Sequence, residues 1–276
     1  MNEQRLRLPR LEALLVECGM AGTVQNFYDD LSSYYHLIFE DWEASMAGQA
    51  AALAPILVRE CGTATQIKIL DCACGIGTQA LGLAKAGFCV TGADLSPRAI
   101  ERARVEASAR SLNLQLHVAD MLHLNAVPET GFDAVICMDN ALAHFSCDED
   151  LAEAAAQIRK KLRAGGIFVA SIRDYDHLIQ ERPVIQGPSF FSDDEGRRRI
   201  VFQVWDWIDE RRYTFHLYIT CDTPTGWRTH HGVSTCRAVL RDELTSMLEG
   251  AGFERVRWML PAESGFYQPL VLGVAG

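Results

Sequence analysis

The residues best suited to chemistry lie in one short segment, Asp71-Cys-Ala-Cys-Gly75-Ile-Gly77. An apolar run at residues 67–72 overlaps its start and a helical pattern follows it, which predicts a strand, a glycine turn and a helix. Glycines in such a turn let the backbone approach a ligand closely. A further acid, Asp94, ends the next apolar run, 94 − 77 = 17 residues after Gly77. An acid there is placed to bind ribose hydroxyls, so the pattern predicts a nucleoside-binding site.

Two classes of nucleoside-binding protein share this arrangement, the nicotinamide dehydrogenases and the S-adenosylmethionine-dependent methyltransferases. The spacing Gly75-x-Gly77-x-x-Ala80 fits the dinucleotide pattern. However, Asp71 precedes the glycines by four residues, Ala119-Asp120-Met121 follows the third predicted strand, and Asp139-Asn140 follows the fourth. Together these positions resemble the motif series of class I S-adenosylmethionine-dependent methyltransferases, over residues 66–175 and the C-terminal helix and strands.

The resemblance implies a set of contacts with S-adenosylmethionine. The glycines pass under its methionine part, and Asp71 orders the loop or binds the cofactor ammonium. Asp94 takes the ribose hydroxyls, and Asp120 meets the adenine amino group. The full cofactor set expected is Asp71, Ala73, Gly75, Gly77, Asp94, Leu95, Asp120, Met121, Met138 and Trp42.

A closer resemblance concerns the glycine and sarcosine N-methyltransferases. Met138-Asp139-Asn140-Ala-Leu-Ala-His144 is similar to the motif after their fourth strand, and Ser171-Ile-Arg173-Asp-Tyr175 to the segment after their fifth, whose Arg binds the substrate carboxylate. The aromatic residues between 27 and 42 resemble their lid. The resemblance implies substrate contacts from Asn140, Arg173, Tyr175, Tyr218 and His230. Where that family has a Tyr facing the methyl acceptor, this chain has Thr229-His230-His231, which leaves the particular substrate open.

The implied chemistry is an in-line attack of a lone pair on a sulfonium methyl group, which needs alignment and a closed pocket rather than a protein nucleophile. An amine acceptor must be neutral to attack, so a histidine base is useful. We therefore expect catalytic roles for His144, His231 and Tyr28. The planar guanidinium of Arg173 suits a carboxylate, with an ion pair to Asp174 or Asp176 as the alternative.

The elements that must position these residues follow an alternating pattern. Apolar runs at residues 67–72, 89–93, 114–118, 134–138 and 167–172 alternate with helical patterns at 79–86, 97–109 and 148–162. Such alternation predicts a parallel sheet covered on both faces. Runs at 200–208, 212–220 and 228–234 predict antiparallel strands, and a helix at 241–251 precedes strands at 253–260 and 269–275.

The predicted fold is therefore α/β, a Rossmann-like, doubly wound and mostly parallel sheet of the class I methyltransferase kind. We expect a helical N-terminal cover over residues 1–62, including a helix around Leu11, and a cofactor-binding core over 63–175. An antiparallel β insertion spans 176–235, and 236–276 complete the sheet.

Composition limits the partners. The 276 residues carry 26 basic and 36 acidic side chains, a net charge of −10, which argues against nucleic acid or an anionic membrane. No apolar stretch approaches the ~20 residues that span a bilayer, and the start lacks a signal-peptide pattern. The nine cysteines favour free thiols in a reducing cytoplasm, with no metal expected. The edges of the insertion leave a homo-oligomer open.

The sequence thus predicts an S-adenosylmethionine-dependent methyltransferase of a small molecule, acting on nitrogen of an amino-acid-like or amine acceptor. An O- or S-methyltransferase, a nicotinamide-dependent oxidoreductase and a catalytically silent S-adenosylmethionine-binding protein are the alternatives.

Overall fold

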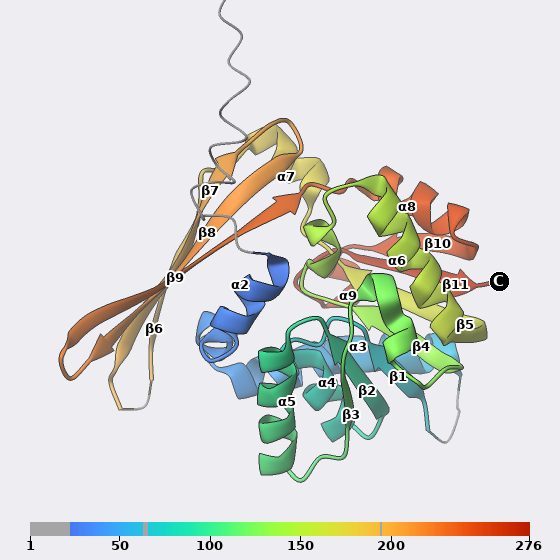
Figure 1. The fold of residues 1–276 in the computed structure, drawn as a ribbon, viewed down its shortest axis with the longest axis horizontal. Coiled ribbons are helices and arrows are strands. Elements are labelled where there is room, and N and C mark those ends of the chain that lie inside the picture. Colours follow the sequence, from blue (N-terminus) through green and yellow to red (C-terminus); the bar gives the residue numbers. More distant parts are fainter. Residues whose placement is uncertain (1–22, 63–65, 194) are drawn as a thin grey trace, which may run out of the picture.

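The computed structural model describes residues 23–62, 66–193 and 195–276 (Figure 1). The helix predicted around Leu11 lies outside these residues. The described chain forms a seven-stranded sheet with helices on both faces, a separate four-stranded sheet, and a short helical segment between the two.

The seven-stranded sheet has the order β10-β11-β5-β4-β1-β2-β3. Five strands run parallel, namely β1 (Lys68–Asp71), β2 (Cys89–Asp94), β3 (Gln115–Val118), β4 (Phe132–Cys137) and β5 (Leu162–Ser171). Antiparallel to β5 runs β11 (Leu270–Ala275), followed at the edge by β10 (Phe253–Met259). The strand order reverses between β1 and β4, and in open α/β sheets ligands bind at the carboxyl ends of strands at such a point.

Alternate residues of the central strands face opposite layers of helices. Ile69, Ile136 and Val169 pack under α3 (Trp42–Cys61), α4 (Thr78–Lys85) and α5 (Pro97–Ala109). Leu70 and Val135 pack on the other face, under α6 (Asp148–Lys161) and α8 (Arg241–Gly250). Burial on both faces explains why the buried parts of these strands are mainly apolar rather than alternating between apolar and polar residues.

Local signals set the helix starts near the sheet edge. The Ser96 side chain accepts a hydrogen bond from the backbone of Ala99, and Pro97 occupies the first turn of α5. Asp41 caps α3 in the same way, accepting from the backbone of Ala44. These caps place both helix starts beside the carboxyl ends of the strands.

The second sheet, here called the lid sheet, has the order β6-β7-β8-β9 and is antiparallel throughout. Its strands are β6 (Ile185–Ser192), β7 (Arg198–Trp207), β8 (Arg212–Thr223) and β9 (Gly226–Arg237), preceded by α7 (Tyr175–Glu181). The last three strands were predicted. The structure begins β7 two residues earlier and ends it one residue sooner than predicted, and it lengthens β8 and β9 by three and five residues. The first, β6, was not predicted, because Gly187-Pro188 interrupts it and most of its side chains are exposed. The last strand of the lid sheet ends at Arg237, two residues beyond the predicted end of the insertion at residue 235.

A helical cover lies between the lid sheet and the α/β body (Figure 1). It comprises α2 (Val24–Leu31) and the short 3₁₀ helix η1 (Tyr35–Ile38). Arg199 of β7 donates hydrogen bonds to the carbonyl oxygens of Leu37, Phe39 and Glu40, so one lid side chain holds the end of this cover.

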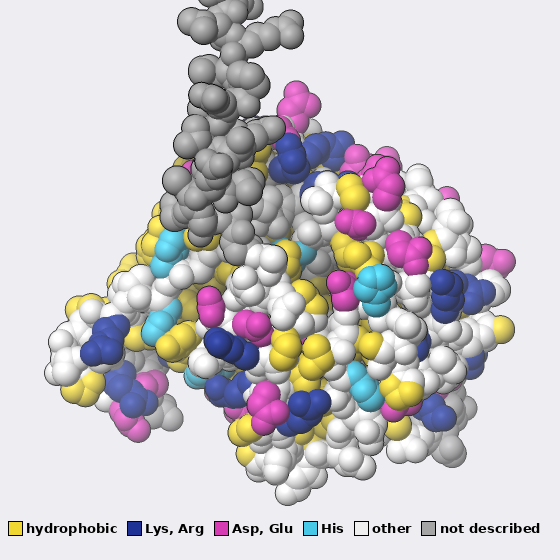
Figure 2. All heavy atoms as spheres, in the orientation of Figure 1, with side chains coloured by type: hydrophobic (Ala, Val, Ile, Leu, Met, Phe, Trp, Pro, Cys, Tyr) yellow, Lys and Arg dark blue, Asp and Glu magenta, His cyan; other side chains and the backbone are white. Residues whose placement is uncertain are grey.

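Other sequence-based expectations concern cysteines and surfaces. The eight described cysteines are all free, and Cys72, Cys74, Cys137 and Cys236 are buried. Within the described ranges no helix is both long and apolar enough to cross a bilayer, and no three metal-ligating side chains gather in one place. Basic and acidic side chains are interspersed on the face seen in Figure 2.

Replacement of Arg199 tests its role in holding the cover. Arg199→Met keeps the aliphatic length but leaves three carbonyl groups without their donor, so we expect the free energy of unfolding to fall by about 1–3 kcal/mol. Hydrogen exchange of residues 35–40 should accelerate. Arg197→Met is the matched control, because Arg197 is exposed and pairs only with Asp193 and Glu195. Equal exchange of residues 35–40 in the two variants would contradict the role of Arg199.

Candidate active site

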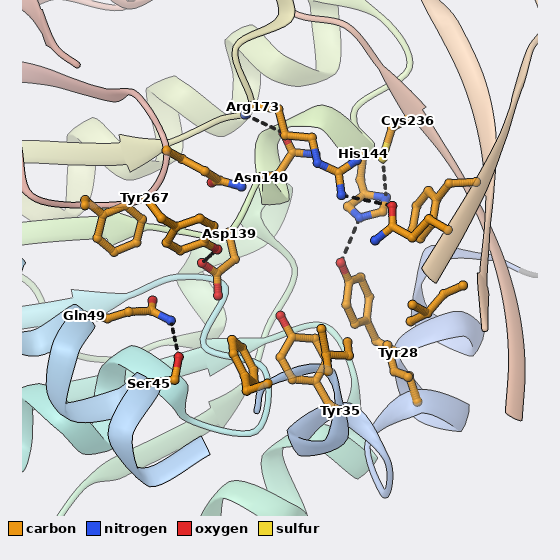
Figure 3. Close-up of a pocket in the computed structure, with 18 of the residues that line it drawn as sticks. Tyr28, Tyr35, Ser45, Gln49, Asp139, Asn140, His144, Arg173, Cys236 and Tyr267 are labelled. Carbon is orange, nitrogen blue, oxygen red and sulfur yellow. Dashed lines mark hydrogen bonds between the residues drawn. The ribbon is translucent and has the colours of Figure 1, made fainter. Parts of the chain in front are cut away.

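Two adjoining cavities open at the carboxyl ends of the central strands. The smaller has a volume of about 180 Å³ and is lined by the loops after β1, β2, β3 and β4. The larger, of about 640 Å³, lies between the α/β body, the cover and the lid sheet. Its polar lining residues come from both the core and the lid (Figure 3).

The glycine turn after β1 forms the floor of the smaller cavity. Gly75 and Gly77 have φ angles of +52° and +100°, which only glycine adopts readily. A Cβ atom on Gly75 would meet nothing within 4 Å, so open space lies above this backbone. The carboxylate of Asp94 holds the turn, accepting from the backbone nitrogen of Gly75 at 2.8 Å and from that of Ser96 at 2.9 Å.

Apolar and acidic side chains form the walls of the smaller cavity. Leu95, Met121 and Met138 offer surfaces for a flat ring, and Asp94, Asp120 and Asp139 bring three carboxylates. No Lys or Arg is present among its described lining residues. Behind the turn, Oδ2 of Asp71 is buried without a hydrogen-bond partner, and burial raises the pKa of this carboxyl well above its usual value.

This lining suits a cationic nucleoside better than an anionic one. The three carboxylates would repel the pyrophosphate of a dinucleotide, which helix N-termini and cationic groups normally hold. S-Adenosylmethionine offers an adenine for the apolar walls, ribose hydroxyls for Asp94, and positive charge for the acids. The residues present therefore fit this group.

The predicted cofactor residues divide into three groups. Those that line the cavity are Ala73, Gly75, Asp94, Leu95, Asp120, Met121 and Met138. Asp71 and Gly77 shape the turn from behind; a Cβ on Gly77 would come within 2.9 Å of the Leu81 side chain. Trp42 is a correction, because its indole is buried away from both cavities and donates to the hydroxyl of Thr78 at 3.0 Å. Its ring packs with Ile76 and Leu81 instead.

Arg173 is the main charged feature of the larger cavity. Its guanidinium donates to the hydroxyl of Tyr213 at 2.9 Å and to Oε1 of Gln203 at 3.2 Å, and lies 4.7 Å from the centre of the Trp205 ring. No carboxylate of the described residues lies within ion-pair distance of it. The alternative pairing with Asp174 or Asp176 is not observed, since both carboxylates pair with Arg241 at 3.3 Å.

Asn140 lines the same cavity but is also held from behind. Its Oδ1 accepts from the backbone nitrogen of Arg173 at 3.1 Å, and its Nδ2 donates to the hydroxyl of Tyr175 at 2.9 Å. Tyr175 was predicted to contact substrate, but it is fully buried behind the cavity and contacts the hydroxyl of Tyr213 at 2.8 Å. It is a positioning residue for Asn140 and Tyr213.

Four residues line both cavities and form what we call the junction: Tyr28, Tyr35, Asp139 and His144. The hydroxyl of Tyr28 and Nε2 of His144 are hydrogen-bonded at 2.8 Å. Burial, with the charge of Arg173, lowers the pKa of His144 to about 4, so its imidazole is neutral at pH 7. Burial also raises the pKa of Tyr28 well above its ordinary value.

Asp139 is the functional candidate that the sequence analysis missed. Its φ is +57°, an uncommon value for a residue with a side chain, and such residues cluster at functional sites. Its carboxylate accepts from Nε2 of Gln79 at 2.8 Å and from the hydroxyl of Tyr267. Burial raises its pKa. Its place between Met138 and Asn140, after the fourth strand, was the signal that could have identified it.

Three predicted residues of the lid sheet do not reach the larger cavity. Phe215, Leu217 and Cys236 line it, and alternation along β8 and β9 then turns Tyr218 and His231 to the opposite face. There His231 stacks on Tyr218 and contacts Nδ1 of His216 at 3.1 Å. His230 is on the inner face but stacks on Tyr34, in a separate groove. The described geometry therefore does not bring these three residues to the larger cavity and gives no support to their predicted roles at the acceptor.

Comparison with known proteins places this site in a family context. Residues 69–166 match the family described as "Methyltransferase domain". The chain is 31% identical over 156 residues to a glycine/sarcosine N-methyltransferase of Parasynechococcus marenigrum, covering 56% of this chain and 54% of that protein. It is 35% identical over 125 residues to human glycine N-methyltransferase, covering 41% and 42%. The chain spans about half the length of the curated relatives it matches.

Solved structures agree in fold over a larger part of the chain. The DesVI protein of Streptomyces venezuelae gives a TM-score of 0.69 at 22% identity, covering 84% of this chain and 92% of that one. The sugar N-methyltransferase KedS8 of a Streptoalloteichus species gives 0.68 at 18% identity, covering 99% and 96%. The predicted fold class and family resemblance are confirmed. Residues 69–166 resemble a methyltransferase domain, and the described chain has the fold of the class I S-adenosylmethionine-dependent methyltransferases.

Proposed function

We propose that the chain is an S-adenosylmethionine-dependent methyltransferase that methylates nitrogen in a small amine carrying a carboxylate. The observation that carries the acceptor class is Arg173, a cavity-lining guanidinium without a carboxylate partner among the described residues. A buried positive charge without a counter-charge costs free energy unless a ligand pairs with it, and a planar guanidinium pairs best with a carboxylate. The curated relatives, named for glycine and sarcosine, support the same class.

S-Adenosylmethionine, when bound, supplies a methyl group on a sulfonium that a lone pair can attack. The chain contributes binding and alignment. Leu95, Met121 and Met138 enclose the ring, and Asp94 binds the ribose. These contacts would place the methyl-bearing end of S-adenosylmethionine at the junction. Alignment of two reactants in this way can supply up to about 7–11 kcal/mol of the barrier reduction.

The larger cavity orients the acceptor and excludes water. Arg173 and Gln203 bind the carboxylate, and the adjacent amine then lies toward the junction. Phe27, Phe39 and Phe215 are apolar lining residues around it, and removal of water favours a reaction in which charge disperses. Nε2 of His144 is already hydrogen-bonded to Tyr28, and the low pKa of His144 makes it too weak a base to deprotonate an ammonium. The acceptor must therefore bind as the neutral amine.

The alternatives of other classes are less well supported. A nicotinamide-dependent oxidoreductase would need a pyrophosphate beside three carboxylates. A silent S-adenosylmethionine-binding protein would not need a second cavity that meets the first. An O- or S-methyltransferase stays open, and a cytoplasmic location and a small-molecule partner, rather than nucleic acid or membrane, remain part of the proposal.

An acceptor screen tests the proposal directly. Formation of S-adenosylhomocysteine is measured with amino acids, biogenic amines, amino sugars, phenols and thiols. With the best acceptor, Arg173→Ala should raise its KM by roughly 100-fold with little change in the KM of S-adenosylmethionine. Arg173→Lys should rescue only part of this, because the paired geometry is lost. A best acceptor without an acidic group, whose kinetics ignore Arg173→Ala, would refute the carboxylate role.

The cofactor assignment has its own test. Asp94→Asn keeps the size of the side chain but removes its charge, so S-adenosylmethionine binding should weaken by about 1.5–3 kcal/mol by calorimetry. Asp30→Asn, a change of an exposed acid outside both cavities, should leave the affinity unchanged. Unchanged affinity in folded Asp94→Asn protein would remove Asp94 from the ribose site.

The pKa of His144 predicts a pH effect on stability. Unfolding restores its usual value near 6.5, so between pH 6.5 and 4 the unfolded chain binds the extra proton. The contribution of neutral His144 to the free energy of unfolding is fully present above pH 6.5 and is lost as the pH falls toward 4. The free energy of unfolding of wild type minus that of His144→Gln should fall by up to about 3 kcal/mol over this range. A difference that stays flat with pH would show that His144 titrates normally.

A further inference from the structure

The larger cavity extends past the junction, away from Arg173. This extension, here called the second compartment, is lined by one face of α3 and by the segment between α9 (Pro261–Ser264) and β11. In Figure 3, Ser45, Gln49, Asp139 and Tyr267 lie to the left of Tyr35, whereas Arg173 lies above it and His144 and Cys236 lie to its right. Its lining residues are Ser45, Gly48, Gln49, Ala52, Gly265, Phe266, Tyr267 and Gln268.

The second compartment is rich in hydrogen-bond acceptors. Oε1 of Gln49 accepts from Gln79 at 2.6 Å, and the hydroxyl oxygen of Ser45 accepts from Nε2 of Gln49 at 3.1 Å. The carboxylate of Asp139 stands at the entrance, bonded to neutral donors only. No Lys or Arg of the described residues lines this compartment. Among the described residues that line the larger cavity, Arg173 is the one with a cationic side chain, and its guanidinium is hydrogen-bonded to Tyr213 and Gln203 of the lid sheet.

The whole cavity is therefore polarised, with a guanidinium at one end and a carboxylate toward the other. Its volume of about 640 Å³ lies in the range of sites that enclose drug-sized ligands. A molecule as small as glycine would leave most of this space to water, including the polar compartment. Water there would also reach the junction, where its exclusion favours transfer.

We propose that the acceptor is an amino carboxylate longer than glycine, and that its far end is a cationic group bound in the second compartment by Asp139. The proposal rests on the proposed function for the orientation of the carboxylate on Arg173. The cation would pair with the carboxylate and donate to the oxygens around it, notably those of Tyr267 and Gln49. Asp139, whose hydrogen-bond donors are both neutral, would gain a charged partner in this way.

Gly48 offers a way to close the compartment without disturbing the fold. It lies inside α3, faces the cavity, and has nothing within 4 Å of the position its Cβ would take. A larger residue there fills the compartment, and it also replaces a glycine in a helix, which favours helix formation. Ala47 is the matched control, since it is exposed on the same helix and lines no cavity.

The test compares three probes by calorimetry in the presence of S-adenosylhomocysteine: glycine, norleucine and free lysine. Norleucine and lysine have the same chain length and differ in the terminal ammonium. Lysine should bind roughly tenfold or more tightly than norleucine, because only its ammonium pairs with Asp139. Glycine should bind most weakly.

Two variants locate the effect. Asp139→Asn, which tolerates the left-handed backbone, should remove the preference for lysine while leaving norleucine unchanged. Gly48→Leu should weaken lysine and norleucine but not glycine, and Ala47→Leu should change none of the three. Equal affinities of wild type for lysine and norleucine would overturn the proposal. So would an Asp139→Asn variant that weakens only S-adenosylmethionine, because the carboxylate would then belong to the cofactor.

The outcomes separate this proposal from the proposed function. Binding needs no methyl transfer, so a lysine preference without S-adenosylhomocysteine formation from any acceptor would uphold the compartment and refute the enzyme. Rapid methylation of glycine with no preference for longer probes would uphold the methyltransferase activity and refute the second compartment as a binding site.

Discussion

A single hydrogen-bonded network joins the core to the lid, and the larger cavity depends on it. The backbone nitrogen of Arg173 holds Asn140, Asn140 holds Tyr175, and the hydroxyl of Tyr175 meets that of Tyr213 on β8, which returns to the Arg173 guanidinium. Two of its members follow strands of the central sheet and one belongs to the lid sheet. Buried polar groups in such closed networks are strongly placed, because breaking one bond leaves its partner unsatisfied. The lid sheet is therefore fixed to the core through Arg173, a residue that also lines the larger cavity.

Charge is distributed unevenly around the two cavities. Acids gather on the smaller cavity and at the entrance to the second compartment, whereas Arg173 is surrounded by hydroxyls, an amide and the Trp205 ring. Tyr213 and Gln203 accept from two of the guanidinium's five N–H donors without neutralising its charge, so an anionic ligand would find both free donors and a full positive charge. A carboxylate at Gln203 would have removed that partner. The proposed selectivity for a carboxylate depends as much on the absence of an ion pair with Arg173 among the described residues as on the arginine itself.

The core and the cofactor loop were predictable because their signals are local. Residues 134–138 are apolar throughout and residues 67–72 are apolar except for Lys68 and Asp71, as expected of strands covered on both faces, and Gly75, Asp94 and Asp120 lie at or just after the carboxyl ends of strands. The lid was harder to predict. Successive side chains of a strand point to opposite faces of the sheet, so a shift of one residue changes which side chains face the cavity. Phe215 and Leu217 face it, and Tyr218 therefore faces away. The sequence also does not reveal which aromatic residues of this segment line a cavity: Tyr28 and Tyr35 lie at the junction, whereas Trp42 packs against Ile76.

The segment after β4 shows how backbone strain arranges the site. Asp139 and Asn140 have φ angles of +57° and +70°, two successive left-handed residues with side chains. Each such residue costs on the order of 1 kcal/mol or more and persists only where its surroundings enforce it. Here Ser171 of β5 enforces both, since its hydroxyl accepts from the nitrogen of Asp139 at 2.7 Å and its carbonyl accepts from that of Asn140 at 3.1 Å. This turn sends Asp139 toward Tyr267 and Asn140 toward Tyr175, so adjacent residues serve opposite sides of the cavity. The placement of Asp139 and Asn140 in the larger cavity therefore originates in a backbone conformation that the neighbouring strand imposes.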